Sequence, residues 1–170
     1  MPTYKRFENL PVWKDSIRLA ERVYAMTQTP DFKGHYSLRD QIERAAVSVS
    51  NNVAEGFERG TTNELLSFIY IARGSAGEVR SMLCLLERLK PFKHLKSQIS
   101  DLKSVAESCS RQLRAWADSL QNSDIEGQRR LNEKSKKQWE SKKTKVQNEK
   151  EWRQQLIDTL GSDHPAIPPA

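Results

Sequence analysis

The sequence has little of what export, membrane insertion or a disulfide framework requires. It contains only two cysteines, Cys84 and Cys109, among 170 residues, and both lie in apolar runs typical of small buried thiols. The N-terminal segment MPTYKRFENL lacks the apolar centre of a signal peptide, and no run approaches the ~18 uninterrupted apolar residues of a membrane span. We therefore expect a soluble, unexported protein in a reducing cytoplasm, with no membrane partner.

Residue clusters that would indicate an enzyme are also missing. The three histidines, His35, His94 and His164, lie far apart without metal-ligand spacing, and no glycine-rich phosphate loop follows a strand. Glu55 and Glu78 are the only carboxylates that the pattern embeds in apolar helical faces, so they are the only candidates for acid–base chemistry. Such a carboxylate is more often held by a donor side chain, because an unpaired buried charge is very costly. We expect no catalytic residue, no metal and no cofactor.

Glycine and proline are few, and they divide the chain into helix-sized intervals without alternating strand patterns. A first helix is predicted from Pro11, which is tolerated in a first turn, and Ser37 is a good N-cap for the second. Thr61 and Glu64 have capping-box spacing before the third. The fold class predicted is all-α, an antiparallel up-down four-helix bundle with a charged helical C-terminal extension. The first helix is expected to bury Val12, Trp13, Ile17, Leu19, Ala20, Val23 and Tyr24.

The expected third helix carries two apolar stripes. The seam from Leu65 to Leu86 advances by alternating steps of four and three residues, as a bundle helix requires. A second stripe runs beside it and either widens the core contact or forms a subunit interface. The candidate interface residues on this second stripe are Phe68, Ile71, Ser75, Glu78 and Met82.

Domain organisation follows from where the apolar periodicity stops. We expect a bundle over residues 1–120, a charged helical extension over 121–160 and a disordered tail over 161–170. In the extension, lysines can neutralise phosphates and a tryptophan can stack on a base. A solvated charged helix explains the same lysines equally well. The RNA-binding candidates are Arg129, Arg130, Lys134, Lys136, Lys137, Trp139, Lys142, Lys143 and Lys145.

The segment AAVSVSNNVAEGFERG places polar residues within an apolar helical stretch. Arg44, Ser48, Asn51 and Glu55 are separated by four, three and four residues, so they share one stripe, which we call the polar track. The polar track is a candidate binding surface if it faces solvent, and a hydrogen-bonded specificity device if it faces another helix. Gly56 and Gly60 are expected to allow the chain to end this helix and turn tightly.

Three segments in order carry a family resemblance: FENLPVWKDSIRLAERVY, SLRDQIERAAVSVSNNVAEGFERG and FIYIARGSAGEVRSMLCLLERL. Their RAAVS and NVAEG runs, and a Gly-Ser pair with a glutamate three residues later, resemble the four-helix bundle proteins of the 23S ribosomal RNA intervening-sequence family. The resemblance covers roughly residues 5 to 120. Where the family typically has a proline, this chain has Ser50, and its lysine-rich extension also departs from the family pattern. The matching motif positions are Glu55, Gly56, Gly74, Ser75 and Glu78, with structural roles expected.

The resemblance implies a bacterial protein that forms a closed, pentamer-like ring of bundles with basic surfaces. A relative, the accessory variability determinant of diversity-generating retroelements, binds RNA and a reverse transcriptase. Together with the net charge of +6, this favours a non-enzymatic homo-oligomer that binds RNA or a ribonucleoprotein. The alternative is a protein-interaction scaffold, for example an accessory subunit of a retroelement reverse transcriptase, recognised through Trp152, Leu156 and Leu160.

Overall fold

The computed structural model describes residues 4–122 and 133–160, with the side chains of 133–136, 138, 139 and 160 left out. The chain forms two compact units, residues 1–129 and 130–170, and each is described by itself. The described part of the chain contains no β-strand, so the predicted all-α class is confirmed. The elements are η1 (Phe7–Asn9), α1 (Pro11–Thr27), η2 (Pro30–Phe32), α2 (Tyr36–Glu58), α3 (Thr62–Arg88), η3 (Lys90–Leu95), α4 (Lys96–Gln121) and α5 (Glu133–Leu160).

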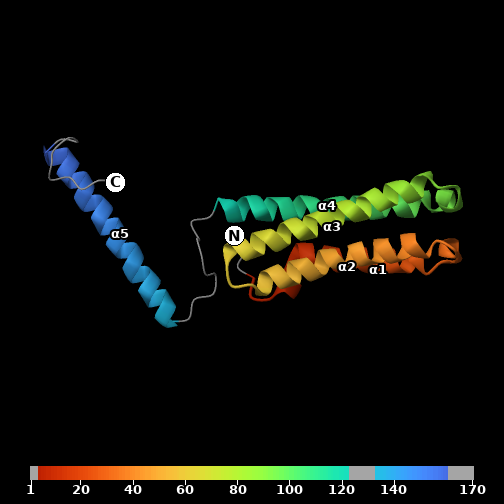
Figure 1. Ribbon diagram of the computed structural model, residues 1–170, viewed down its shortest axis with the longest axis horizontal. Helices are drawn as coiled ribbons and strands as arrows, with labels where there is room; N and C mark the ends of the chain where they lie inside the picture. The colour runs from red at the N-terminus through yellow and green to blue at the C-terminus, as the bar shows by residue number, and fades with distance from the viewer. Residues whose placement is uncertain (1–3, 123–132, 161–170) are drawn as a thin grey trace. The chain divides into compact units, whose positions relative to one another are not determined.

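Helices α1 to α4 form the first unit. Each helix packs against the next, and α1 also packs against α4, so the four helices enclose a common interior. Figure 1 shows the chain reversing direction at each connection between them. None of the helices in 4–122 and 133–160 is long and apolar enough to cross a membrane.

The interior is filled by the residues whose spacing is helical in the sequence. The α3 seam from Leu65 to Leu86 is buried, as are Ala45, Val49 and Val53 on α2, which removes most of their apolar surface from water. At one end of the bundle the connections η2 and η3 contribute Phe32 and Phe92, whose ring centroids lie 4.8 Å apart. Tyr24 was expected inside but is 42% exposed, because Val23 and Met26 take the inward positions of the last turns of α1.

The helix starts agree with the sequence in two cases and differ in one. α1 begins at Pro11, and α3 begins after Thr61, whose hydroxyl accepts a hydrogen bond from the Glu64 N–H at 3.2 Å. The prediction that Ser37 caps α2 is wrong, since the helix begins at Tyr36. The Arg39 N–H already donates to the His35 carbonyl at 3.0 Å, and the His35 ring packs on Phe92 at 5.3 Å. A tertiary contact therefore sets this helix start.

Gly56 does not end α2, because the helix continues to Glu58. It lies instead where α2 meets α3: a Cβ added at Gly56 would be 2.7 Å from the Phe68 Cβ and 3.2 Å from the Leu65 Cδ1. Such distances are well below normal carbon–carbon contact. The glycine is thus required by close packing of two helices, and the expectation that it helps to terminate the helix is wrong.

Candidate nucleic-acid interface

The polar track on α2 faces mainly solvent. Arg44, Asn51 and Glu55 are exposed and Ser48 is half-buried. Arg44 pairs with Asp40 one turn earlier, with 3.1 Å between Nη2 and Oδ2. Glu55 accepts a hydrogen bond from Arg59, the next residue along the same face. Three of the four residues therefore face solvent, which is the arrangement expected of a binding surface.

Ser48 instead faces a neighbouring helix, which is the arrangement expected of a hydrogen-bonded specificity device. Its hydroxyl and the hydroxyl of Ser75 on α3 are hydrogen-bonded at 2.8 Å. The Asn52 amide donates to the Ser48 carbonyl at 2.7 Å and to its hydroxyl at 3.0 Å, while Ser75 also contacts the Ile71 carbonyl at 3.1 Å. This network satisfies polar groups at the α2–α3 contact, and it fixes how the two helices face each other.

The second stripe of α3 is divided between the core and the surface. Met82 and Ser75 are buried inside the chain's own bundle, whereas Ile71 is 51% exposed. Phe68 is half-buried beneath the Arg59 guanidinium, which lies 5.0 Å from the ring centroid. Within one chain the stripe thus widens the core contact at two positions and leaves the others available to a neighbour.

Glu55 and Glu78 are exposed, so the prediction that they are embedded in apolar faces is wrong. Glu78 lies beside the buried Val79 on the outer side of the seam, where the Gln41 amide of α2 donates to it at 3.2 Å. The described residues hold no group of three or more His, Cys, Asp or Glu side chains that could bind a metal.

The pKa shifts in the bundle are explained by ordinary packing. The Lys103 ammonium donates to the Glu87 carboxylate at 2.9 Å, and this hydrogen bond lowers the pKa of Glu87. Burial raises the pKa of the Cys109 thiol, as expected for a group whose charged form loses hydration. Both groups lie away from the polar track.

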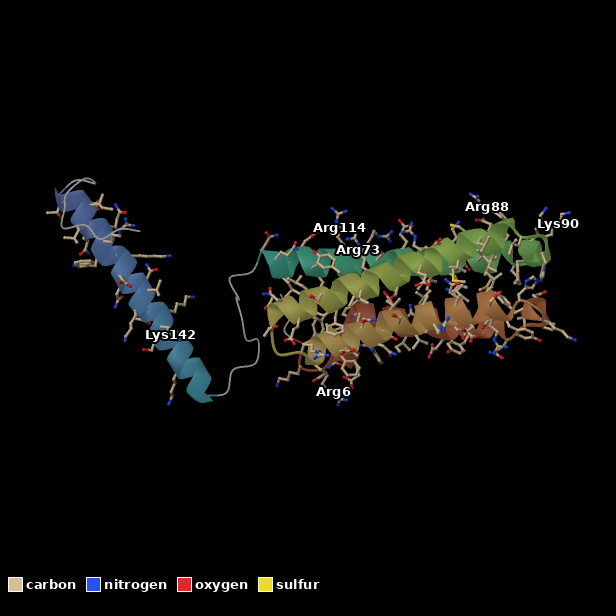
Figure 2. The ribbon with its side chains drawn as sticks, in the orientation of Figure 1. Arg6, Arg73, Arg88, Lys90, Arg114 and Lys142 are labelled. Carbon is tan, nitrogen blue, oxygen red and sulfur yellow. The ribbon has the colours of Figure 1, made fainter. Side chains whose placement is uncertain are left out.

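Sequence reasoning missed a set of arginines on the outer side of α3. Arg73, Arg80 and Arg88 form no ion pair with any residue in the described ranges. Figure 2 shows Arg88 pointing outward from the bundle and labels Arg73 on α3 and Arg114 on α4. The signal in the sequence was the seven-residue spacing of Arg73 and Arg80 on the side of α3 away from its apolar seam.

The second unit presents cations on α5. Lys137, Lys142, Lys143 and Lys145 are exposed, and Figure 2 shows Lys142 extending from the helix. Trp152 is half exposed as well. Other candidates in this region are not placed: Lys134, Lys136 and Trp139 have no described side chains, and Arg129 and Arg130 lie outside the described residues.

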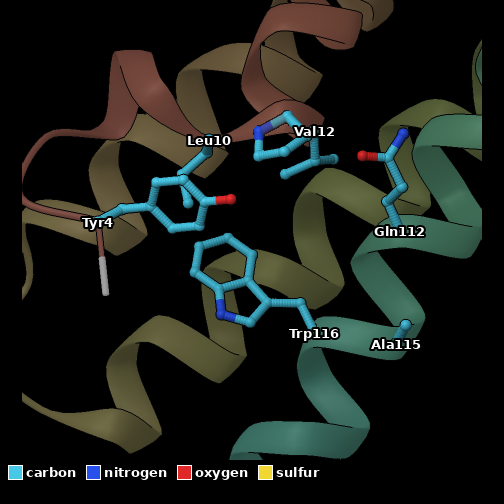
Figure 3. A pocket seen from close by; sticks show the side chains of 7 residues that line it. Tyr4, Leu10, Val12, Gln112, Ala115 and Trp116 are labelled. Atoms are coloured by element: carbon cyan, nitrogen blue, oxygen red, sulfur yellow. The ribbon is translucent and has the colours of Figure 1, made fainter. Parts of the chain in front are cut away.

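An apolar pocket of about 350 Å³ lies at the end of the bundle where the chain enters α1. Figure 3 shows the rings of Tyr4 and Trp116 beside the side chains of Leu10 and Val12. The amide of Gln112 borders the pocket, and it donates to an Asp15 carboxylate oxygen at 2.7 Å. These walls suit an apolar side chain and offer no cation for a phosphate.

No curated protein matches this chain. The family model described as 23S rRNA-intervening sequence protein matches residues 8–115. This range begins in η1 and extends into α4, so it covers nearly all of the bundle and leaves α5 outside. The match spans more than half of the chain, and the helical structure agrees with it. The chain therefore belongs to the 23S rRNA-intervening sequence protein family.

Proposed function

We propose that the protein is a non-enzymatic, homo-oligomeric RNA-binding protein in which α5 supplies much of the affinity for RNA. The observation that carries this proposal is the density of lysine in the extension: residues 134–145 contain six lysines and one glutamate. The lysine side chains described there are exposed. Membership of a family named for a ribosomal RNA insertion supports the same class of partner.

The charge on α5 predicts a strong dependence of binding on salt. Each phosphate that a cation neutralises releases most of a counterion, which gives a slope of log K against log salt of about −0.7 per contact for single-stranded RNA. Changing Lys137, Lys142, Lys143 and Lys145 to glutamine should make that slope less steep by about three. The lysines are exposed and lie outside the bundle, so the fold of the bundle should be unchanged.

The test measures binding of poly(U) and of a duplex RNA to the full-length wild type and to the full-length four-glutamine variant at several salt concentrations. A chain shortened after Asn122 is a second comparison, since the bundle has its own core. Equal affinities and equal slopes in all three proteins would exclude α5 as the source of affinity. The arginines on the outer side of α3, of which Arg80 and Arg88 are exposed, would then be the next surface to examine.

We also propose that the bundle assembles through the exposed part of the second stripe, as a pentamer by resemblance to its family. Ile71 and Leu85 are large apolar side chains left in solvent. Between them Gly74 and Gly77 have no atom within 4 Å of an added Cβ, so a neighbouring backbone can approach closely. Ile71→Asp should reduce the mass measured by light scattering without unfolding the bundle. A wild-type particle with the mass of one chain would contradict the proposal.

The alternative partner is a protein, such as a reverse transcriptase. Two observations favour it: the half-exposed Trp152 on α5 and the apolar pocket beside Trp116. Apolar docking responds weakly to salt, whereas phosphate contacts weaken steeply. A partner that remains bound at high salt and is released by Trp152→Ala would support this alternative over RNA.

A further inference from the structure

A second cavity, of about 350 Å³, lies along the polar track, where α1 and α2 pack together. Its volume is at the lower end of the range for small-ligand sites, so it suits one planar group better than a helix. We call it the α1–α2 cleft. It is lined by Tyr24, Arg44, Val47, Ser48, Asn51 and Asn52.

Two polar side chains of the cleft have no structural task in the described chain. The Tyr24 hydroxyl and the Asn51 amide make no hydrogen bond with any other described residue. The Asn52 amide, by contrast, donates to both the carbonyl and the hydroxyl of Ser48. Asparagine is a poor residue for a helix interior, and the Tyr24 side chain is 42% exposed. The fold of the bundle therefore does not explain why tyrosine and asparagine stand at positions 24 and 51.

The third polar group of the cleft is the Arg44 guanidinium, which can exchange its present partner for a ligand. Arg44 has a side chain 73% exposed, and its pairing with Asp40 is an ordinary surface ion pair, which contributes little to stability. Two other carboxylates of α2 lie near, and neither lines the cleft. Glu43 accepts hydrogen bonds from Thr27 and Arg39, and Glu55 accepts one from Arg59. A phosphate can therefore replace Asp40 at the guanidinium without meeting a carboxylate in the cleft wall.

We propose that the α1–α2 cleft binds one unpaired nucleotide of RNA. The base stacks on the Tyr24 ring beside Val47, and its edge pairs with the Asn51 amide, which donates and accepts at once. The phosphate lies at Arg44. This inference rests on the proposed RNA-binding function and adds a division of roles: α5 attracts RNA of any sequence, and the cleft selects an unpaired base.

The test uses the full chain with poly(A), poly(C), poly(U) and a duplex RNA as probes. Tyr24→Ala should weaken binding of the preferred single-stranded probe about five- to a hundred-fold, while Tyr24→Phe, which keeps the ring, should retain most of it. Asn51→Ala should reduce the differences between the three homopolymers. Tyr36→Ala is the matched control, because Tyr36 is also an exposed tyrosine near the start of α2 but does not line the cleft. Duplex binding should be the same in all variants.

Three results would overturn the inference. If the wild type binds RNA and Tyr24→Ala binds it equally well, the cleft is not a nucleotide site, and the proposed function is unaffected. If Tyr24→Ala lowers the particle mass in light scattering as well as RNA binding, the cleft is a contact between copies of the chain. If the wild type binds none of the probes under low salt, the proposed function itself fails, and the cleft proposal fails with it.

Discussion

Replacing Gly56 by alanine tests the closest contact between α2 and α3. An added Cβ would lie 2.7 Å from the Phe68 Cβ and 3.4 Å from the Leu65 carbonyl oxygen. The Phe68 Cβ is bonded directly to the α3 backbone, so rotating a side chain cannot relieve the contact. The two helices must instead move apart by several tenths of an ångström, which also loosens the core around them.

The same substitution has opposite contributions to stability. In an open helical position, alanine is favoured over glycine by about 0.8–1 kcal/mol, while overpacking a core contact costs about 1–3 kcal/mol. We expect Gly56→Ala to lower the free energy of unfolding by about 1 kcal/mol. Gly74→Ala and Gly77→Ala, where an added Cβ meets nothing within 4 Å, should raise it by about 0.5–1 kcal/mol.

Urea unfolding followed by circular dichroism measures these differences, and thermal unfolding should show shifts of about 2–4 °C per kcal/mol for a chain of this size. Light scattering on the same samples separates folding from assembly at Gly74 and Gly77. A Gly56→Ala protein stabilised as much as Gly74→Ala would refute the close approach of α2 and α3.

Three further outcomes are expected. Thr61→Ala should cost about 1 kcal/mol in urea unfolding, because the hydroxyl that accepts from a first-turn N–H of α3 is lost, whereas Thr61→Ser should be close to the wild type. A thiol reagent at neutral pH should modify the half-buried Cys84 before the buried Cys109, whose pKa is raised by burial, and equal rates would contradict the packing. Because Lys103 lowers the pKa of Glu87, the pair should stabilise the fold above the unfolded pKa of about 4.3, and this stabilisation should be lost as the pH falls through the lower folded pKa. Lys103→Met should remove that part of the acid dependence of stability. An unchanged profile of stability against pH would show that the pair contributes nothing.

The sequence predicts the elements whose signals are local. Pro11 and Thr61 mark helix starts through backbone chemistry that needs only the next few residues, and the Leu65 seam follows from a period that any bundle helix must have. The seam also predicts burial correctly, because each of its apolar side chains must leave water together with its neighbours.

Features that depend on a neighbouring helix are predicted poorly. A glycine near the end of a helical pattern is typical of a C-cap, and nothing local to Gly56 reveals that Phe68 passes beside it. The errors at Glu55, Glu78 and Tyr24 have one cause: adjacent residues on a helix differ by about 100° in direction. A stripe assigned one residue too wide therefore places exposed side chains in the core.

The polar residues inside α2 separate into two kinds once their partners are known. Asn52 donates to Ser48, and the Ser48 hydroxyl is hydrogen-bonded to Ser75 of α3, so both residues are explained by the packing of two helices. Asn51, one residue before Asn52, has no such partner in the described chain and lines the α1–α2 cleft. Both amides line the cleft, but only Asn52 is held by a neighbouring side chain, because one step along a helix turns the side chain by about 100°. Since the fold accounts for one and not for the other, Asn51→Ala should leave stability near that of the wild type or raise it, whereas Asn52→Ala should lower it by about 1 kcal/mol by removing donors from a part-buried network. Urea unfolding of the two variants decides the matter, and an equal loss at both positions would show that Asn51 serves the fold after all.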